Sequence, residues 1–215
     1  MNLGIVGAEN SHAGAIGKLL NIDKKIRGLK ATHIWGETKA FAQSAAEKGD
    51  IPTIVDNPEE MIGQVDCVMI DHRDGIFHVP AAIPFVQAGL PVFVDKPLST
   101  RLRDAKKLMK LRRERGVPVT SMSAVPWQAS TDTLIRDMKK LAPLGSLQLV
   151  GAGDYKSKYG GIGFYGIHIV ETMIRIVGAQ ARWVRAETNG PNCSVLVGYG
   201  SSHDGGEVDY NDGLV

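Results

Sequence analysis

The chain has 215 residues, of which 43% are hydrophobic and 22% charged, and its formal net charge is +2 at pH 7. These values are ordinary for a globular protein and exclude a strong electrostatic attraction to nucleic acid or to a membrane surface. No apolar run of the sequence reaches the roughly 18 residues of a membrane span. The two cysteines, Cys67 and Cys193, indicate no disulfide framework. Because a strand-like segment begins at Leu3, we also expect no signal peptide, and the sequence predicts a cytoplasmic protein.

Short apolar runs alternate with amphipathic segments over the first two-thirds of the chain. The runs predicted as strands are Leu3–Val6, Ala31–Trp35, Ile51–Val55, Asp66–Asp71, Pro91–Pro97 and Pro118–Ala124. The segments predicted as helices are Ser11–Leu20, Phe41–Gly49, Pro58–Gln64, Phe77–Gly89, Thr100–Gly116 and Trp127–Leu141. Such alternation favours the α/β class, with a doubly wound parallel sheet whose ligands bind at the carboxyl ends of the strands. We therefore predict a Rossmann-type, dinucleotide-binding domain over residues 1–122.

The pattern changes from Ser146 onward. One helix, Tyr165–Val177, is predicted among segments typical of an antiparallel sheet, namely Ser146–Tyr155, Ala181–Asn189, Ser194–Ser202 and Gly206–Asn211. A short open sheet has an unpaired edge that must be covered. We therefore predict a shortened α+β domain over residues 123–215, which serves substrate binding and oligomerisation, and we expect a homo-oligomer through its sheet.

The segment after the first predicted strand begins like a phosphate-binding turn. A G-x-G-x-x-G turn that starts at Gly7 would have glycines at positions 9 and 12, where this chain has Glu9 and His12. Glycine lets the backbone approach a pyrophosphate closely. The repulsion between the Glu9 carboxylate and a phosphate charge about 4 Å away would cost about 1 kcal/mol in water and about 4 kcal/mol at an intermediate dielectric. The turn therefore predicts a dinucleotide pocket that is weakened or reshaped.

Two features compensate in part for the carboxylate of Glu9. Asn10 and Ser11 are good N-cap residues, and a helix N-terminus attracts anions. A cation such as His12 or Arg73 can also neutralise the carboxylate, unless the side chain of Glu9 turns outward. We therefore expect the turn still to hold a dinucleotide.

Four segments together carry a resemblance to the Gfo/Idh/MocA family, named after glucose–fructose oxidoreductase, inositol dehydrogenase and MocA. They are Gly4–Ala13, Asp66–His78, Val92–Ser99 and Gly163–Met173, in the family's order. The third is the most specific, because Asp95-Lys96-Pro97 differs by one residue from the family's E-K-P tripeptide. The resemblance covers nearly the whole chain, although the family's second domain is usually much longer.

The resemblance implies two catalytic residues. The counterpart of Lys96 lies beside the nicotinamide and the substrate hydroxyl, where it can hold a proton or stabilise an alkoxide. His168 matches the histidine of a D-x-G-x-H pattern whose acid is Phe164 here, and it would act as the general base for the hydroxyl proton. Tyr155 or Tyr165 would replace the missing acid as a hydrogen-bond partner. These two tyrosines, Lys96 and His168 are the expected substrate-binding residues, and we expect Lys96 and His168 to share one cleft.

The resemblance also implies a dinucleotide in the first domain. The family usually carries an acid after the second strand that binds the adenosine ribose hydroxyls, and Glu37 is the matching residue, one place later than usual. A carboxylate there disfavours a 2′-phosphate, so NAD is favoured over NADP. The family's Thr-Pro turn is replaced by the polar run Asp71–Asp74. The expected cofactor-binding residues are Gly7, Asn10, Ser11, His12, Glu37, His72 and Lys96.

Three functions remain open at this point. The first is an NAD(P)-dependent oxidoreductase that removes hydride from a secondary hydroxyl of a sugar, a cyclitol or a related small polyol. The second is a relative without redox chemistry, an acid–base or metal-assisted lyase, hydrolase or isomerase that would use His12, Asp71, His72, Asp74, Lys96 and His168. No pair of these has a recognised metal-ligand spacing, so we expect no metal. The third is a non-catalytic binding subunit. The first two require a small-molecule substrate.

Overall fold

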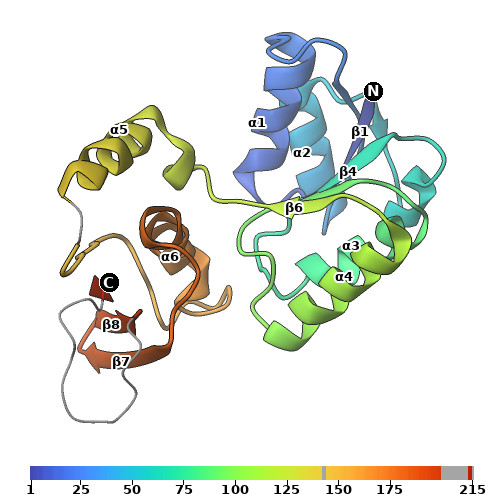
Figure 1. Cartoon of the computed structure of the whole chain (residues 1–215). Helices are drawn as coiled ribbons and strands as arrows, with labels where there is room; N and C mark the ends of the chain where they lie inside the picture. Colours follow the sequence, from blue (N-terminus) through green and yellow to red (C-terminus); the bar gives the residue numbers. More distant parts are fainter. Residues whose placement is uncertain (142–143, 200–212, 215) are drawn as a thin grey trace. The chain divides into compact units, whose positions relative to one another are not determined.

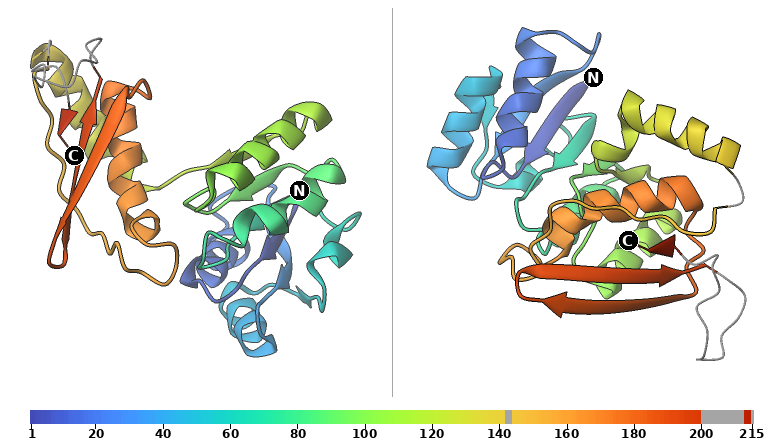
Figure 2. Two further views of the ribbon diagram at one scale, coloured as in Figure 1. Left: turned by 90° about the horizontal axis from the view of Figure 1, so that it is seen from below. Right: turned by 90° about the vertical axis from the view of Figure 1, so that its left-hand side faces the viewer.

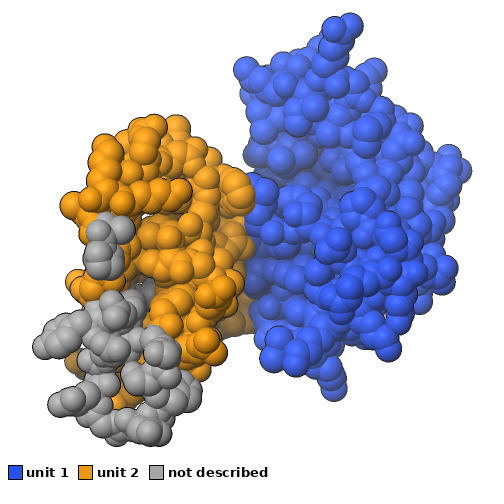
Figure 3. All heavy atoms as spheres, in the orientation of Figure 1, with its two compact units in different colours: residues 1–122 blue, residues 123–215 orange. Residues whose placement is uncertain are grey.

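The computed structural model describes residues 1–141, 144–199 and 213–214. The chain divides into two compact units, Met1–Met122 and Ser123–Val215, which Figure 3 colours separately. Among the described residues, no helix combines the length and the apolar character that a membrane crossing requires.

The first unit is built on a six-stranded sheet in which all strand pairs are parallel. Its strands are β1 (Asn2–Val6), β2 (Lys30–Trp35), β3 (Thr53–Ile54), β4 (Cys67–Ile70), β5 (Val92–Val94) and β6 (Val119–Ser121). Their spatial order is β3-β2-β1-β4-β5-β6, so the direction of winding reverses between β1 and β4. The predicted Rossmann-type sheet is confirmed, and its ligand-binding switch point lies where β1 and β4 end.

Helices cover both faces of this sheet, as Figure 1 shows. They are α1 (Ser11–Gly17), which continues as a π-helical turn over Lys18–Ile22, α2 (Lys39–Gly49), α3 (His78–Gln87) and α4 (Leu102–Arg115), with a 3₁₀ turn at Pro58–Met61. Successive strand residues point to opposite faces. Ile5 accordingly packs with Ala13 and Ala45 on the α1 and α2 side, whereas Val6 packs with Phe85 on the other. Both faces are apolar and covered, which explains the continuous apolar runs of the strands.

The second unit is a small α+β structure. It contains a 3₁₀ turn at Val125–Trp127, α5 (Ala129–Met138), a second 3₁₀ turn at Lys139–Leu141, α6 (Gly163–Val177), β7 (Trp183–Asn189), β8 (Asn192–Gly198) and β9 (Gly213–Leu214). The sheet order is β7-β8-β9, both pairs are antiparallel, and α6 runs alongside the sheet in Figure 2. The predicted fold class is thereby confirmed for this unit as well.

One predicted strand of the second unit is wrong. Residues 146–154 form neither helix nor strand. A Cβ atom built on Gly151 would lie 2.6 Å from Cδ1 of Ile169, and one on Gly153 would lie 3.1 Å from Cδ1 of Ile162. The glycines therefore let this segment lie close against side chains of α6 and of Ile162, which precedes it. The alternating apolar residues that predict a strand lie in a segment that packs on a helix instead. The predicted strand at Gly206–Asn211 falls outside the described residues.

We predict that Gly7→Ala destabilises the protein by about 3 kcal/mol, because strain and a steric clash add. Gly7 has a φ of +105°, and a Cβ there would lie 2.6 Å from the backbone nitrogen of His72. Urea denaturation of the full chain, followed by circular dichroism, measures the change. Gly28→Ala is the matched control, since Gly28 has a φ of +83° with no atom within 4 Å of the added Cβ. Equal losses in the two variants would contradict the clash.

Candidate functional site

Three loops meet at the carboxyl edge of the first sheet. They follow β1, β4 and β5, whose ends lie side by side because the strands are parallel neighbours. The backbone of Gly7 lies directly against the backbone of Asp71 and His72. Gly7 also donates its N–H to the carbonyl of Trp35, the last residue of β2. This close packing brings polar side chains from separate loops within reach of one another.

The carboxylate of Glu37 fixes the turn after β1. Its Oε2 atom accepts hydrogen bonds from the backbone N–H groups of Ala8 and Glu9, both at 2.9 Å. Its other oxygen, Oε1, is buried and has no hydrogen-bond partner in the described part of the chain. The glycine-poor turn is therefore held by a carboxylate within the protein, one of whose oxygens is unsatisfied among the described contacts.

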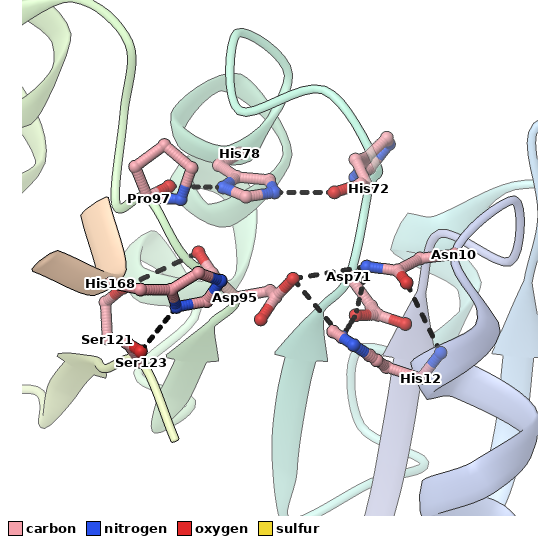
Figure 4. A network of polar contacts seen from close by, with 10 residues as sticks. All are labelled: Asn10, His12, Asp71, His72, His78, Asp95, Pro97, Ser121, Ser123 and His168. Atoms are coloured by element: carbon pink, nitrogen blue, oxygen red, sulfur yellow. Dashed lines mark hydrogen bonds and ion pairs between the residues drawn. The ribbon is translucent and has the colours of Figure 1, made fainter. Parts of the chain in front are cut away.

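A second cluster joins four side chains from the loops after β1, β4 and β5 (Figure 4). Asn10 Nδ2 donates to Asp71 Oδ1 at 3.4 Å and to Asp95 Oδ2 at 3.2 Å. His12 Nδ1 lies 3.6 Å from the same oxygen of Asp71 and 3.4 Å from that of Asp95. The Asp71 side chain is 0% exposed, whereas that of His12 is 47% exposed. The cluster thus places a half-exposed imidazole over two carboxylates, one of them fully buried.

The charges of this cluster are strongly coupled. Hydrogen bonding to Asp71, and then to Asp95, raises the pKa of His12 to about 10, although burial opposes the rise. Burial raises the pKa of Asp71 to about 7 despite the opposing hydrogen bond from His12. Burial also disfavours ionisation of Asp95, but the hydrogen bond and charge of His12 outweigh it and lower the pKa of Asp95. An imidazolium is therefore the natural counter-ion of Asp95, and Asp71 can exchange a proton near neutral pH.

The same side chains are the one group in the described residues whose geometry suits a metal ion. Each of His12, Asp71 and Asp95 offers one ligand atom, and these three atoms lie within 4.8 Å of one another. Imidazole and carboxylate ligands suit several divalent cations. A cation would have to displace the proton that His12 shares with the two carboxylates. Sequence reasoning placed His12 and Asp71 among the candidate acid–base residues but missed Asp95 as their partner, because no two of the three residues are close in sequence.

Two histidines connect the loops after β4 and β5. His78 is fully buried, with Nδ1 2.7 Å from the carbonyl oxygen of Pro97 and Nε2 2.8 Å from that of His72. The ring of His72 lies 5.8 Å from that of Trp35, and its Nδ1 is buried without a partner among the described residues. Burial lowers the pKa of His72 to about 4, so its ring is neutral at physiological pH. His78 was not among the predicted site residues, and it holds the loop that carries Lys96.

The remaining predicted residues of the first unit lie on these loops. Ser11 is the first residue of α1, and Asn10 Oδ1 caps that helix by accepting the N–H of His12 at 3.4 Å. Lys96 lies between Asp95 and the Pro97 carbonyl that contacts His78. The described residues contain four buried polar side-chain atoms without a hydrogen-bond partner, and three of them lie here: Glu37 Oε1, Asp71 Oδ2 and His72 Nδ1. Unsatisfied buried polar atoms are rare in native proteins, so this concentration makes the edge a candidate binding site.

In the second unit, His168 lies on α6 beside Ser123. Its Nδ1 is 2.6 Å from Ser123 Oγ, and the Tyr165 ring centroid lies 5.9 Å from that of the imidazole. Tyr155 donates its hydroxyl to the carbonyl of Gly190 at 2.7 Å. The hydroxyl partner of His168 is therefore a serine that sequence reasoning missed, rather than Tyr155. Lys96 and His168 belong to different units, and their convergence on one cleft stays a prediction.

Comparison with known proteins places this site in a family context. The model of the Gfo/Idh/MocA oxidoreductase family, described as a NAD-binding Rossmann fold, matches residues 1–123. The Salmonella typhimurium protein YceM is 26% identical over 154 residues, which are 69% of this chain and 48% of that protein. Inositol 2-dehydrogenase of Corynebacterium glutamicum is 28% identical over 120 residues, 55% of this chain and 34% of that enzyme. The chain thus spans less than half of each of these relatives.

Solved structures share the fold at low identity. Myo-inositol 2-dehydrogenase of Lactobacillus plantarum has a TM-score of 0.78 at 17% identity, over 92% of this chain and 66% of that one. Biliverdin reductase of Synechocystis, solved with biliverdin and NADP⁺, has a TM-score of 0.73 at 16% identity, over 99% of this chain and 70% of that one. The WlbA dehydrogenase of Chromobacterium violaceum, solved with NADH and UDP-GlcNAcA, has a TM-score of 0.75 at 16% identity. The match covers 93% of this chain and 64% of that one. These neighbours use either dinucleotide, so the fold does not decide between NAD and NADP.

We predict that Asp95→Asn lowers the pKa of His12, because one of the two carboxylates that hold the proton is removed. Nuclear magnetic resonance titration of the imidazole in the full chain measures the pKa.

Because the folded-state pKa of His12 is raised from 6.5 to about 10, the stability that His12 contributes is complete below pH 6.5 and is lost as pH rises through about 10. Asp56→Asn, at an exposed ion pair with Lys39, is the control and should leave His12 unchanged. Titration of His12 near 6.5 in the unmodified chain would contradict the cluster.

Proposed function

The chain belongs to the Gfo/Idh/MocA oxidoreductase family, and from that membership we propose that it is an NAD-dependent dehydrogenase. Its substrate would carry a secondary hydroxyl on a sugar, a cyclitol or a related small polyol. Inositol 2-dehydrogenase is among the relatives and among the structural neighbours, which supports the substrate class. One observation carries the proposal: the Glu37 carboxylate is bound to the turn after β1 and keeps a buried oxygen without a partner.

Glu37 suits the adenosine ribose. A ribose hydroxyl is a donor, and Oε1 of Glu37 is an acceptor without a partner among the described residues. Charge-assisted hydrogen bonds of this kind are about twice as strong as neutral ones. A 2′-phosphate would bring a second negative group to a part-buried carboxylate that cannot move without releasing Ala8 and Glu9. These contacts favour NAD over NADP.

The remaining loops offer polar groups that could contact the rest of a dinucleotide. The imidazolium of His12 offsets part of the negative charge of Asp71 and Asp95 at this edge. His72 offers a buried ring nitrogen beside the indole of Trp35. When bound, NAD would supply the hydride acceptor. Lys96 would bind the substrate oxygen and help to move its proton, with His168 contributing from the second unit.

The His12–Asp71–Asp95 cluster supports a second candidate function. An acid whose pKa is near 7 is suited to general acid–base catalysis, and burial gives Asp71 that property. A relative without redox chemistry would use Asp71 and His12 in a lyase, hydrolase or isomerase reaction. A thermal-shift titration separates the two candidates, because a true cofactor stabilises the fold as its concentration rises. Stabilisation by NAD or NADH supports the dehydrogenase, whereas no shift at millimolar concentrations discards it.

We predict that Glu37→Gln weakens NAD binding by about tenfold, since a charge-assisted hydrogen bond is worth about 1.5–3 kcal/mol. The same variant should narrow the preference for NAD over NADP, because the negative charge that repels a 2′-phosphate is removed. Calorimetric titration with both dinucleotides measures the two affinities. Glu47→Gln serves as the control: Glu47 is exposed on α2 and accepts only a local hydrogen bond from Gln43 among the described contacts. An unchanged affinity for NAD in Glu37→Gln would remove Glu37 from the site.

We further predict that Lys96→Ala lowers kcat with a cyclitol or sugar substrate by about 100-fold, as expected for loss of a group that handles a proton. Formation of NADH measures turnover, and the thermal shift reports whether NAD still binds. Lys106→Ala, which removes an exposed lysine from α4, should keep full activity. If Lys96→Ala retains full turnover, the lysine has no catalytic role.

A further inference from the structure

We infer that Ser123 sets the tautomer of His168, so that the imidazole carries its proton on Nε2 and offers a hydrogen-bond donor to the substrate oxygen. Ser123 is thereby a positioning residue. The inference rests on the proposed function for its catalytic meaning, and it reverses the general-base role that the family resemblance suggests for His168. The geometry around Ser123 carries it.

The hydrogen bond between the two residues is short and is buried on the serine side. Ser123 Oγ lies 2.6 Å from His168 Nδ1, and Ser123 is 0% exposed. A neutral imidazole has one protonated and one unprotonated nitrogen, and the partner of the first decides the state of the second. The direction of this hydrogen bond therefore decides which ring nitrogen carries the proton of a neutral His168.

The other contacts of the Ser123 hydroxyl show which of the two residues donates in this hydrogen bond. Ser123 Oγ accepts the backbone N–H of Val125 at 3.2 Å, which uses one lone pair. In the described part of the chain, the hydrogen bonds of Ser123 leave one acceptor for the hydroxyl proton, and it is His168 Nδ1. If Nδ1 were protonated instead, the buried hydroxyl would lose its acceptor and the full desolvation penalty would remain. The serine therefore donates, Nδ1 accepts, and the ring proton is on Nε2.

The face of α6 that carries His168 also fixes the position of the serine. Glu171 follows His168 by three residues, a spacing that places both side chains on one face of the helix. Its Oε2 accepts the backbone N–H of Ser123 at 2.6 Å. Thr172 donates to the carbonyl of His168 at 2.7 Å. Ser123 is thus held at its backbone and at its hydroxyl by one helix face, and a hydroxyl that turned away would lose its contact with His168.

The substitution at position 164 fits this arrangement. An ionised carboxylate can only accept, so an acid bound to Nδ1 would require Nδ1–H and leave Nε2 as a base. Phe164 supplies no such group, and its ring packs 4.7 Å from that of Tyr165 and 5.0 Å from that of Tyr159. A serine that donates to Nδ1 produces the opposite tautomer. His168 then donates Nε2–H to the substrate oxygen, and the hydroxyl proton leaves to another group, which is Lys96 in the proposed dehydrogenase.

Nitrogen-15 nuclear magnetic resonance of the full chain without added ligand tests the tautomer directly. The expected result for His168 is an unprotonated Nδ1 and a protonated Nε2, with the signals assigned by their loss in His168→Gln. Ser123→Ala should shift His168 toward a mixture of tautomers, and Ser123→Thr should restore the original one. Ser157→Ala, which removes a hydroxyl elsewhere in this unit, should change nothing. A protonated Nδ1 in the unmodified chain overturns the inference, even if Ser123→Ala does not fold.

Kinetics provide an independent readout. In Ser123→Ala we expect kcat to fall by about tenfold while KM changes by less than about threefold, since a donor made only for the transition state is lost. Ser123→Thr should recover most of the loss. An unchanged kcat in Ser123→Ala would overturn the catalytic meaning of the contact. If the unmodified chain oxidises no polyol, the proposed dehydrogenase fails, while the resonance experiment still decides the tautomer.

Discussion

The site of the first unit depends on one close backbone contact. Gly7 lies so near Asp71 and His72 that a single added Cβ would overlap their backbone atoms. This contact joins the carboxyl ends of β1 and β4 at the point where the sheet reverses its winding. His12, the second residue of α1, thereby lies within 3.6 Å of carboxylates that follow β4 and β5.

Charge balance is the second constraint at this edge. Glu37, Asp71 and Asp95 all lie on loops that a dinucleotide of this family would approach, and Glu9 adds a fourth carboxylate. The structure offsets these charges in two ways: Glu37 accepts two backbone N–H groups, and His12 shares its proton with Asp71 and Asp95. A turn with the usual glycines needs neither device, because its own backbone faces the phosphates. The histidine at position 12 therefore serves as counter-ion to the acids around it.

Much of the fold was predictable from the sequence, because buried parallel strands leave continuous apolar runs such as Cys67–Ile70. The segment 146–155 was not, since its alternation of apolar residues and glycines serves contacts with α6. Motif matching also indicated Lys96 and Glu37 as site residues, because both follow strands. The contact of Ser123 with His168 and the grouping of His12, Asp71 and Asp95 depend on distances in space. No local spacing encodes either of them.

Proton linkage connects the buried acid to the chemistry of its ligand. Burial holds the pKa of Asp71 at about 7, so at neutral pH both protonation states are populated. A negatively charged ligand near Asp71 favours the protonated state and is bound with uptake of a proton, whereas a metal cation favours the carboxylate and is bound with release. The sign of the linkage therefore follows from the charge of the ligand alone. Proton uptake on binding therefore indicates a ligand that brings negative charge near Asp71, and proton release indicates one that brings positive charge.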